Sequence, residues 1–239
     1  MKLRIKFKKY GPIRFIGHLD VMRFFQKAIR RAGIDVAYSQ GFSPHQIMAF
    51  AAPLGVGLTS NGEYMDIEVH SIISCQDVKE RLNQVSVPGI EVTTVKVLPD
   101  NAENAMASVA AASYTVRFRE GKVPETDIET LLPHFLAKER IVITKETKKG
   151  SREVDLKQGL YFLSCENGVL SMLVDASSGG NIKPVQVVEA ILAEAGEKLQ
   201  ENALLITREE VYTHLDTESG SKLIPLDEIG TDEIPCRNA

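Results

Sequence analysis

Two histidines, His18 and His45, stand in segments with no hydrophobic periodicity, which is typical of loops. Imidazole titrates near neutral pH, so the pair could act as general acid and base in RNA cleavage. The structural alternative is that His18 caps or packs at a helix start and that His45 hydrogen-bonds within a turn. We favour the structural alternative over catalysis, but expect both side chains near a functional surface. We expect no metal site, because His18, His45 and Asp20 match no zinc-ligand spacing.

Basic, aromatic and hydroxyl side chains surround these histidines and could together contact RNA. Lysine and arginine would contact phosphates, while Tyr38 and Phe42 could stack on bases. Phe42 could equally fill the core beneath its loop. The predicted RNA-binding residues are Arg14, His18, Arg23, Lys27, Arg30, Arg31, Tyr38, Ser39, Phe42, Ser43 and His45.

A glycine-rich segment before a later helix is a second candidate site. Its residues are Ser178, Gly179, Gly180 and Asn181, and free backbone N–H groups before a helix can hold a phosphate. The segment is neither a Walker nor a Rossmann fingerprint. Lys148, Lys149 and Arg152 form another basic turn, which we interpret as a solvated hairpin tip.

The formal net charge of −4 conceals an asymmetry along the chain. Residues 1–50 hold ten lysines and arginines against Asp20 and Asp35, a balance of +8, so the remaining 189 residues sum to −12. This pattern indicates one electropositive face for an anionic partner, although a solvated strand and helix would read the same way. We expect Arg14, Arg23 and Arg30 to converge on the loops that hold the histidines.

Composition favours an ordinary globular protein, with 44% hydrophobic and 25% charged residues. No apolar run reaches the ~18–20 residues of a membrane helix, and the alternating N-terminus is unlike a signal peptide. We therefore expect a cytoplasmic location and no membrane partner. Cys75, Cys165 and Cys236 lie far apart and form no CxxC pair, so we expect no disulfide framework and no cofactor bound by this chain.

The first hundred residues predict the order strand, helix, strand, strand, helix, strand. The first strand places Leu3, Ile5 and Phe7 on one face and its basic residues on the other. The first helix should end at Gly33 and bury a stripe made of Leu19, Met22, Phe25, Ile29 and Ala32. The predicted elements are 2–8, 18–32, 35–38, 63–70, 75–85 and 90–98, and 47–51 is a further strand or a continuation of 35–38.

The same order recurs in the second half, with a hairpin signal at Asn167-Gly168. The predicted elements there are 114–119, 124–138, 141–147, 160–165, 169–174, 183–195 and 204–214. We therefore predict an α+β protein made of two tandem ferredoxin-like (βαββαβ) units with antiparallel sheets. The expected boundaries are a first unit at 1–99, an Ala-rich linker at 100–113, a second unit at 114–214 and a loosely docked acidic tail at 215–239.

Six short motifs stand out along the chain: Arg14-Phe15-Ile16-Gly17-His18-Leu19-Asp20-Val21-Met22-Arg23, Arg30-Arg31-Ala32-Gly33, Tyr38 to His45, Pro53-Leu54-Gly55, Glu63 to Asp66 and Arg152 to Leu156. Together they resemble a bacterial family of radical-SAM-linked proteins of unknown function. Members of that family stand alone or are fused behind cobalamin-binding radical S-adenosylmethionine enzymes. This chain has Gly17 where serine is expected as often, which argues against a serine role there.

The resemblance implies a radical SAM enzyme as partner, and S-adenosylmethionine, an iron–sulfur cluster and cobalamin would be held by that partner. This chain would then be an accessory protein that binds structured RNA or another anionic substrate. One alternative is an RNA-processing or RNA-modifying enzyme that uses His18 and His45. Another is a protein-interaction module without nucleic acid. Tandem ferredoxin-like units also resemble CRISPR repeat-cleaving proteins and some pseudouridine synthases, which is an analogy of fold alone.

Overall fold

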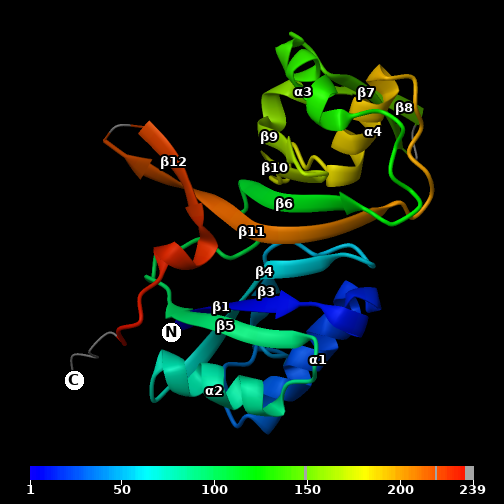
Figure 1. Ribbon diagram of the computed structural model, residues 1–239. Helices are drawn as coiled ribbons and strands as arrows, with labels where there is room; N and C mark the ends of the chain where they lie inside the picture. Colours follow the sequence, from blue (N-terminus) through cyan, green and yellow to red (C-terminus); the bar gives the residue numbers. More distant parts are fainter. Residues whose placement is uncertain (148–149, 219, 235–239) are drawn as a thin grey trace. The chain divides into compact units, whose positions relative to one another are not determined.

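The structure is a computed structural model that describes residues 1–147, 150–218 and 220–234 (Figure 1). The chain forms two compact units, which are described separately below. Unit 1 comprises Met1–Ala110 and Glu210–Ala239, and unit 2 comprises Ala111–Glu209. Helices and antiparallel strands alternate in both, which confirms the α+β class.

The sheet of unit 1 is built around β1 (Lys2–Lys9). This strand pairs antiparallel with β5 (Ile90–Val97) on one side and with β4 (Thr59–Ser71) on the other. Two short strands, β2 (Asp35–Val36) and β3 (Met48–Phe50), pair with β4. The C-terminal part of β11 (Leu204–Thr217) forms a hairpin with β12 (Gly220–Pro225).

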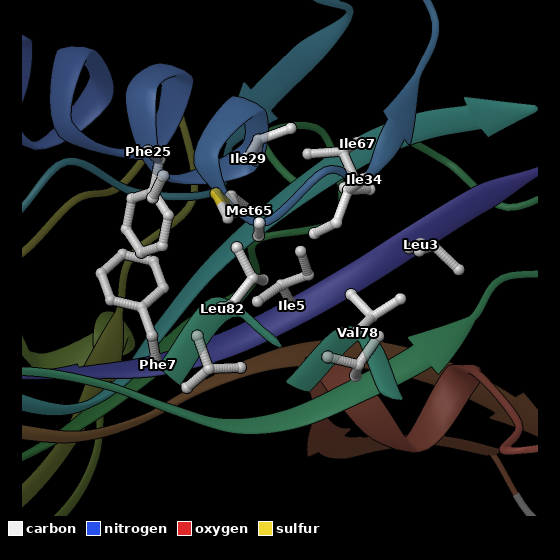
Figure 2. Close-up of a cluster of buried hydrophobic side chains, with 14 of the residues drawn as sticks. Leu3, Ile5, Phe7, Phe25, Ile29, Ile34, Met65, Ile67, Val78 and Leu82 are labelled. Atoms are coloured by element: carbon white, nitrogen blue, oxygen red, sulfur yellow. The ribbon is translucent and has the colours of Figure 1, made fainter. Parts of the chain in front are cut away.

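Two helices of unit 1, α1 (His18–Arg31) and α2 (Cys75–Val85), cover one face of this sheet (Figure 1). Figure 2 shows side chains of both helices meeting those of β1 and β4 in one hydrophobic cluster. Phe7 and Phe25 pack against each other in it, with ring centroids 4.6 Å apart. The predicted alternation of β1 is confirmed, because Leu3, Ile5 and Phe7 all point into this cluster.

The predicted α1 is confirmed almost to the residue, and Gly33 follows it with a φ of 61°. The predicted apolar stripe is partly wrong, since Leu19 is 60% exposed while Val21 is buried. The reason lies in the helical period. Val21 stands four residues before Phe25 on the same face, whereas Leu19 stands six residues before it, about 120° around the axis. The buried side chains of the helix are Val21, Phe25, Ala28 and Ile29.

The opposite face of the unit 1 sheet is polar and covered by other segments of the chain. Arg4 is fully buried and forms a bidentate ion pair with Asp66, at 2.8 and 2.9 Å. The guanidinium also donates to the carbonyls of Glu103 and Leu226, each at 3.1 Å, and Asp66 accepts from the backbone N–H of Ala105 at 2.7 Å. One buried pair therefore fixes two distant segments on the sheet.

These contacts change the expected roles of the linker and the tail. Residues 100–110 pack with unit 1 rather than leading freely out of it. Beyond residue 215 the described residues continue as β11, β12 and the 3₁₀-helix η3 (Leu226–Ile229), so residues 215–218 and 220–234 form an edge of unit 1 rather than a loose tail. Leu226 is completely buried, which explains why this segment docks despite its many acidic residues.

In unit 2, β6 (Ala111–Phe118), β10 (Val169–Asp175) and β9 (Leu160–Glu166) form consecutive antiparallel pairs. The helices α3 (Ile128–Ala137) and α4 (Pro184–Glu194) pack on them (Figure 1). A separate hairpin is formed by β7 (Val142–Thr147) and β8 (Gly150–Asp155), and the 3₁₀-helix η2 (Lys157–Gly159) leads into β9.

Two local signals of unit 2 show how sequence chemistry set its elements. Asn167 and Gly168 join β9 to β10 with φ of 51° and 72°, the left-handed pair that a type I′ hairpin turn requires. The predicted helix at 124–138 begins later, at Ile128, because the Asp127 carboxylate accepts from the N–H groups of Glu129 and Thr130 and caps it there.

Candidate nucleic-acid interface

The motif of residues 14–23, which contains His18, and the Pro53-Leu54-Gly55 motif meet at the start of α1. The 3₁₀-helix η1 (Gly11–Phe15) precedes α1, and the Arg14 carbonyl accepts a hydrogen bond from Gly57 N at 2.8 Å. The His18 ring packs edge-on against Phe50, with centroids 5.0 Å apart. Motifs that lie more than thirty residues apart in the sequence therefore form one end of unit 1.

The second histidine, His45, closes the loop of residues 38–46. Its Nδ1 lies 2.8 Å from Ser39 Oγ, and its backbone N–H donates to the same hydroxyl at 3.1 Å. Tyr38 and Gln46 form a β-bridge just below. At the tip, Phe42 is fully exposed, so of its two interpretations the core plug is wrong.

The contacts give the two imidazoles separate structural roles. His18 packs beside the apolar ring of Phe50, and His45 orders its own loop through Ser39. Within the residues that the structure describes, no hydrogen bond joins the two rings, and no three His, Cys, Asp or Glu side chains gather as metal ligands. The geometry does not assemble them into an acid–base pair.

The loop of residues 38–46 is anchored on α1 beside a row of basic side chains. The buried Gln46 donates through Nε2 to the Gln26 carbonyl at 3.3 Å, and Arg30 Nε donates to the same carbonyl at 3.2 Å. Arg23 and Lys27 lie on neighbouring turns and are exposed. In the described part of the chain, Lys27 has no ion pair or hydrogen bond, and Arg23 has only an exposed contact of 3.3 Å with Asp20.

Arg31 departs from this row. Its guanidinium lies toward α2, where Nη2 is 3.4 Å from the carbonyl of Val85. Ser43 is an exposed neighbour of Phe42 in the same loop. We define the α1 face by exposed or half-exposed residues of three adjoining segments, η1, α1 and the loop of residues 38–46, which are Arg14, Phe15, Leu19, Arg23, Lys27, Arg30, Tyr38, Phe42 and His45.

The basic residues of β1 do not belong to the α1 face. Since Leu3, Ile5 and Phe7 point toward the helices, Arg4, Lys6 and Lys8 point to the other side of the sheet. There Arg4 pairs with Asp66, Lys6 with Glu210, and Lys8 with Glu91. The count of +8 in residues 1–50 therefore overstates the charge that a partner of α1 would meet.

Phe15 is a member of the α1 face that the residue types did not single out. Its ring is 59% exposed, and the Arg14 guanidinium lies 4.7 Å from the ring centroid. In the described residues, Arg14 Nε is buried without a hydrogen-bond partner, so the guanidinium makes its contact by stacking on the Phe15 ring. The available signal was a large hydrophobic residue in a non-periodic segment between Arg14 and Gly17.

The glycine-rich candidate in unit 2 is unsuited to a phosphate. The Asp175 carboxylate accepts from Ser177 N at 2.7 Å and lies so close to Gly180 that a Cβ there would be 2.0 Å from its oxygen. Ser178, Gly179, Gly180 and Asn181 therefore fold around a negative charge already in place. The helix beyond starts with Pro184, which has no N–H to offer.

Two further groups of residues were singled out in the sequence, the basic turn of unit 2 and the three cysteines. Arg152 lies on β8, while Lys148, Lys149 and Cys236 lie outside the described residues. Cys75 and Cys165 are buried free thiols, and burial raises the pKa of both. Cys165 lines a cavity of about 480 Å³ beside Asp127 and Glu129, an acidic setting that an RNA would avoid. No helix of the described residues is long and apolar enough to span a bilayer.

A comparison with models of known protein families identifies the family of this chain. Residues 2–184 match the model of a family described as an uncharacterized protein conserved in bacteria (DUF2344). The chain belongs to this family. The matched stretch contains all the residues of the α1 face.

The remaining comparisons add little. No curated protein has a matching sequence. Among solved structures, the chain is similar to one in the crystal structure of a Cbf5–Nop10–Gar1 complex, with 11% identity and a TM-score of 0.48. The similarity covers 87% of this chain and 48% of that one, so the chain spans about half its length. Such a distant likeness carries no argument about function.

Proposed function

We propose that this chain is an accessory protein that binds RNA through the α1 face and presents it to a radical SAM enzyme. The observation that carries the proposal is the row of exposed Arg23, Lys27 and Arg30 beside the exposed rings of Phe15 and Phe42. Cationic side chains bind phosphates, and exposed aromatic rings bind bases, so the combination fits nucleic acid better than either would alone.

The net negative charge of residues 51–239 would direct an approaching polyanion toward α1. Residues 51–239 sum to −12, so a polyanion is repelled by most of the surface and attracted to α1. An acidic protein would also be attracted there, and its apolar side chains would pack on the same rings. We favour RNA because its phosphates and unpaired bases meet the cations and the rings with one ligand.

The radical SAM partner rests on the sequence resemblance of the histidine, Gly-Phe-Ser-Pro-His and Pro-Leu-Gly motifs. These motifs form the α1 end of unit 1, so the same surface would face substrate and enzyme. S-adenosylmethionine, the iron–sulfur cluster and cobalamin would belong to the partner, since this sequence has no CxxxCxxC motif. Copurification from the native cell, with mass spectrometry of bound proteins, tests this part.

We also propose that each unit is ferredoxin-like. In unit 1 the strand order is β5, β1, β4 and then the short β2 and β3, with α1 and α2 as the two crossovers. In unit 2, β6, β10 and β9 are consecutive neighbours, and the β7–β8 hairpin is an insertion after α3. These orders support the βαββαβ pattern.

The test of RNA binding is a titration of a labelled cellular RNA pool, followed by fluorescence anisotropy at about 50 mM and about 200 mM salt. We expect binding that weakens steeply with salt because counterions are released from the phosphates. The absence of binding at the lower salt would overturn the proposal and favour a protein partner for the α1 face. The length of the recovered RNA reports in the same experiment on the nuclease alternative with His18 and His45.

A further inference from the structure

Two phenylalanines of the α1 face project into solvent from separate loops, Phe15 from η1 and Phe42 from the tip of residues 38–46. We infer that they stack on the bases of unpaired nucleotides, so that the α1 face selects single-stranded RNA segments over A-form duplex. This inference rests on the proposed function and specifies the substrate of the same site.

Phe42 stands at the tip of a loop whose hydrogen bonds and docking contacts do not involve the Phe42 ring. The loop is closed by the bonds between Ser39 and His45 and by the bridge between Tyr38 and Gln46. Its base is held on α1 by the Gln46 amide. None of these contacts uses the phenyl ring, which is fully exposed, so the ring contributes nothing to the core of unit 1. A large apolar group in that position is available to a ligand.

Phe15 is held in place from both sides of its backbone. The carbonyl before it, on Arg14, accepts from Gly57 N at 2.8 Å. The carbonyl after it, on Ile16, accepts from the Nζ of the buried Lys9, also at 2.8 Å. With the Arg14 guanidinium stacked on it, the ring is preorganised, which lowers the entropy lost when a base binds.

The basic row of α1 begins between these two loops and continues past the docking point of the second. Phe15 precedes the first turn, the 38–46 loop docks at Gln26, and Arg23 lies one turn before that point. The basic row from Arg23 to Arg30 extends about 10 Å along the helix axis, a length suited to a strand of a few nucleotides. Exposed aromatic rings together with a cationic row are the combination that binds single strands without reading their sequence.

Duplex RNA cannot use these rings. Its base faces are stacked on each other, and its major groove is too deep and narrow for side chains to enter. Against a duplex, Phe15 and Phe42 would contribute no stacking, and only the phosphate contacts would remain. Discrimination between the two forms of RNA therefore measures the contribution of the rings.

The experiment compares three probes of equal length by fluorescence anisotropy at one salt concentration: an unpaired RNA of about ten nucleotides, the same sequence in a duplex, and an abasic strand. We expect the wild type to bind the unpaired RNA at least about tenfold more tightly than the other two. Phe15→Ala and Phe42→Ala should each weaken binding of the unpaired RNA by about 5- to 100-fold and leave the abasic strand unchanged.

The matched control is Phe162→Ala, which removes another exposed ring, 53% accessible and located on β9 of unit 2. It should bind all three probes like the wild type. Equal affinity for unpaired and duplex RNA, with both α1 face variants unchanged, would overturn the inference and leave the proposed function standing. Loss of the abasic strand by the Phe variants would also overturn it. The absence of binding to every probe would instead overturn the proposed function.

Discussion

The strand β1 and the helix α1 carry the same kinds of basic side chain and use them in opposite ways. On β1, Arg4 is buried against Asp66, and Lys6 is paired with Glu210. On α1, Lys27 has no partner in the described residues, and Arg23 has only an exposed one. Positive charge on β1 holds segments of unit 1 together, whereas positive charge on α1 remains available to a ligand.

The difference depends on which elements supply the carboxylates that pair with the basic residues. The partners of β1 are supplied by its neighbours in the sheet, β4 and β5, by β11, and by η3. In the described residues, the acidic partner of the basic side chains on α1 is Asp20 of its own first turn. A count of charges along a sequence therefore measures an upper limit, and the fold decides how much of it reaches solvent.

The largest expected effect comes from breaking the buried pair. Arg4→Met leaves the Asp66 carboxylate without its counter-charge and the carbonyls of Glu103 and Leu226 without their donor. We expect a loss of about 3–5 kcal/mol in the free energy of unfolding, measured by urea titration with circular dichroism. The double variant Arg4→Met with Asp66→Leu should recover part of that loss. A loss below about 1 kcal/mol would show that the pair is not needed.

A smaller effect with a distinct pH dependence is expected for Tyr64→Phe. The buried Tyr64 hydroxyl lies 2.7 Å from Glu210 Oε1 and 2.8 Å from Asp227 Oδ1, and its removal should cost about 1–3 kcal/mol near neutral pH. Burial, together with these two carboxylates, raises the pKa of Tyr64 well above its ordinary value.

The sign of the pH effect follows from that shift. The folded protein keeps the phenolic proton while the unfolded chain loses it above about pH 10, so this contribution to stability is complete below that value and falls as the pH rises beyond it. Urea titrations at about pH 9 and about pH 11 should therefore show a larger fall for the wild type than for Tyr64→Phe. Equal falls would contradict the assignment.

On α1 the same kind of charge removal should affect binding and spare the fold. Changing Arg23, Lys27 and Arg30 together to Gln removes three exposed cations and no buried contact of the core. We expect stability within about 0.5 kcal/mol of the wild type. The slope of log affinity for unpaired RNA against log salt should fall by about two, since each phosphate contact contributes about 0.7. An unchanged slope would place the RNA elsewhere.

Local chemistry made several elements predictable. The periodicity of α1, the glycine at position 33 and the Asn167-Gly168 turn act within a few residues, and the structure has each of them where the sequence indicated. The exposure of Phe42 was left open between two interpretations, because a residue between glycine and serine reads the same whether its ring is buried or free.

Other features depend on residues far away in the sequence. Alternation placed Arg4 opposite Leu3, but its burial depends on Asp66, 62 positions later, and on Leu226, 222 positions later. The Gly179-Gly180 segment is a different case, since Asp175 is close in the sequence but the residue types alone do not show that its carboxylate lies against Gly180. The ordered end of the chain was missed for a similar reason, since its acidic composition hid the buried Leu226.

The smallest expected effect separates position from net charge. Lys8→Gln and Lys27→Gln each remove one positive charge from an accessible side chain. Lys8 lies on β1 and makes an ion pair of 3.5 Å with Glu91, whose side chain is 46% exposed, so its loss should change stability by at most about 0.5 kcal/mol. The Lys8 variant should keep the wild-type salt slope for RNA, while the Lys27 variant should lower it by about 0.7.

Since both variants have the same net charge, long-range attraction falls equally in the two. Any difference in slope then reports a phosphate contact at α1. If Lys8→Gln lowers the slope as much as Lys27→Gln does, the contrast between β1 and α1 has no consequence for binding, and overall charge alone governs it.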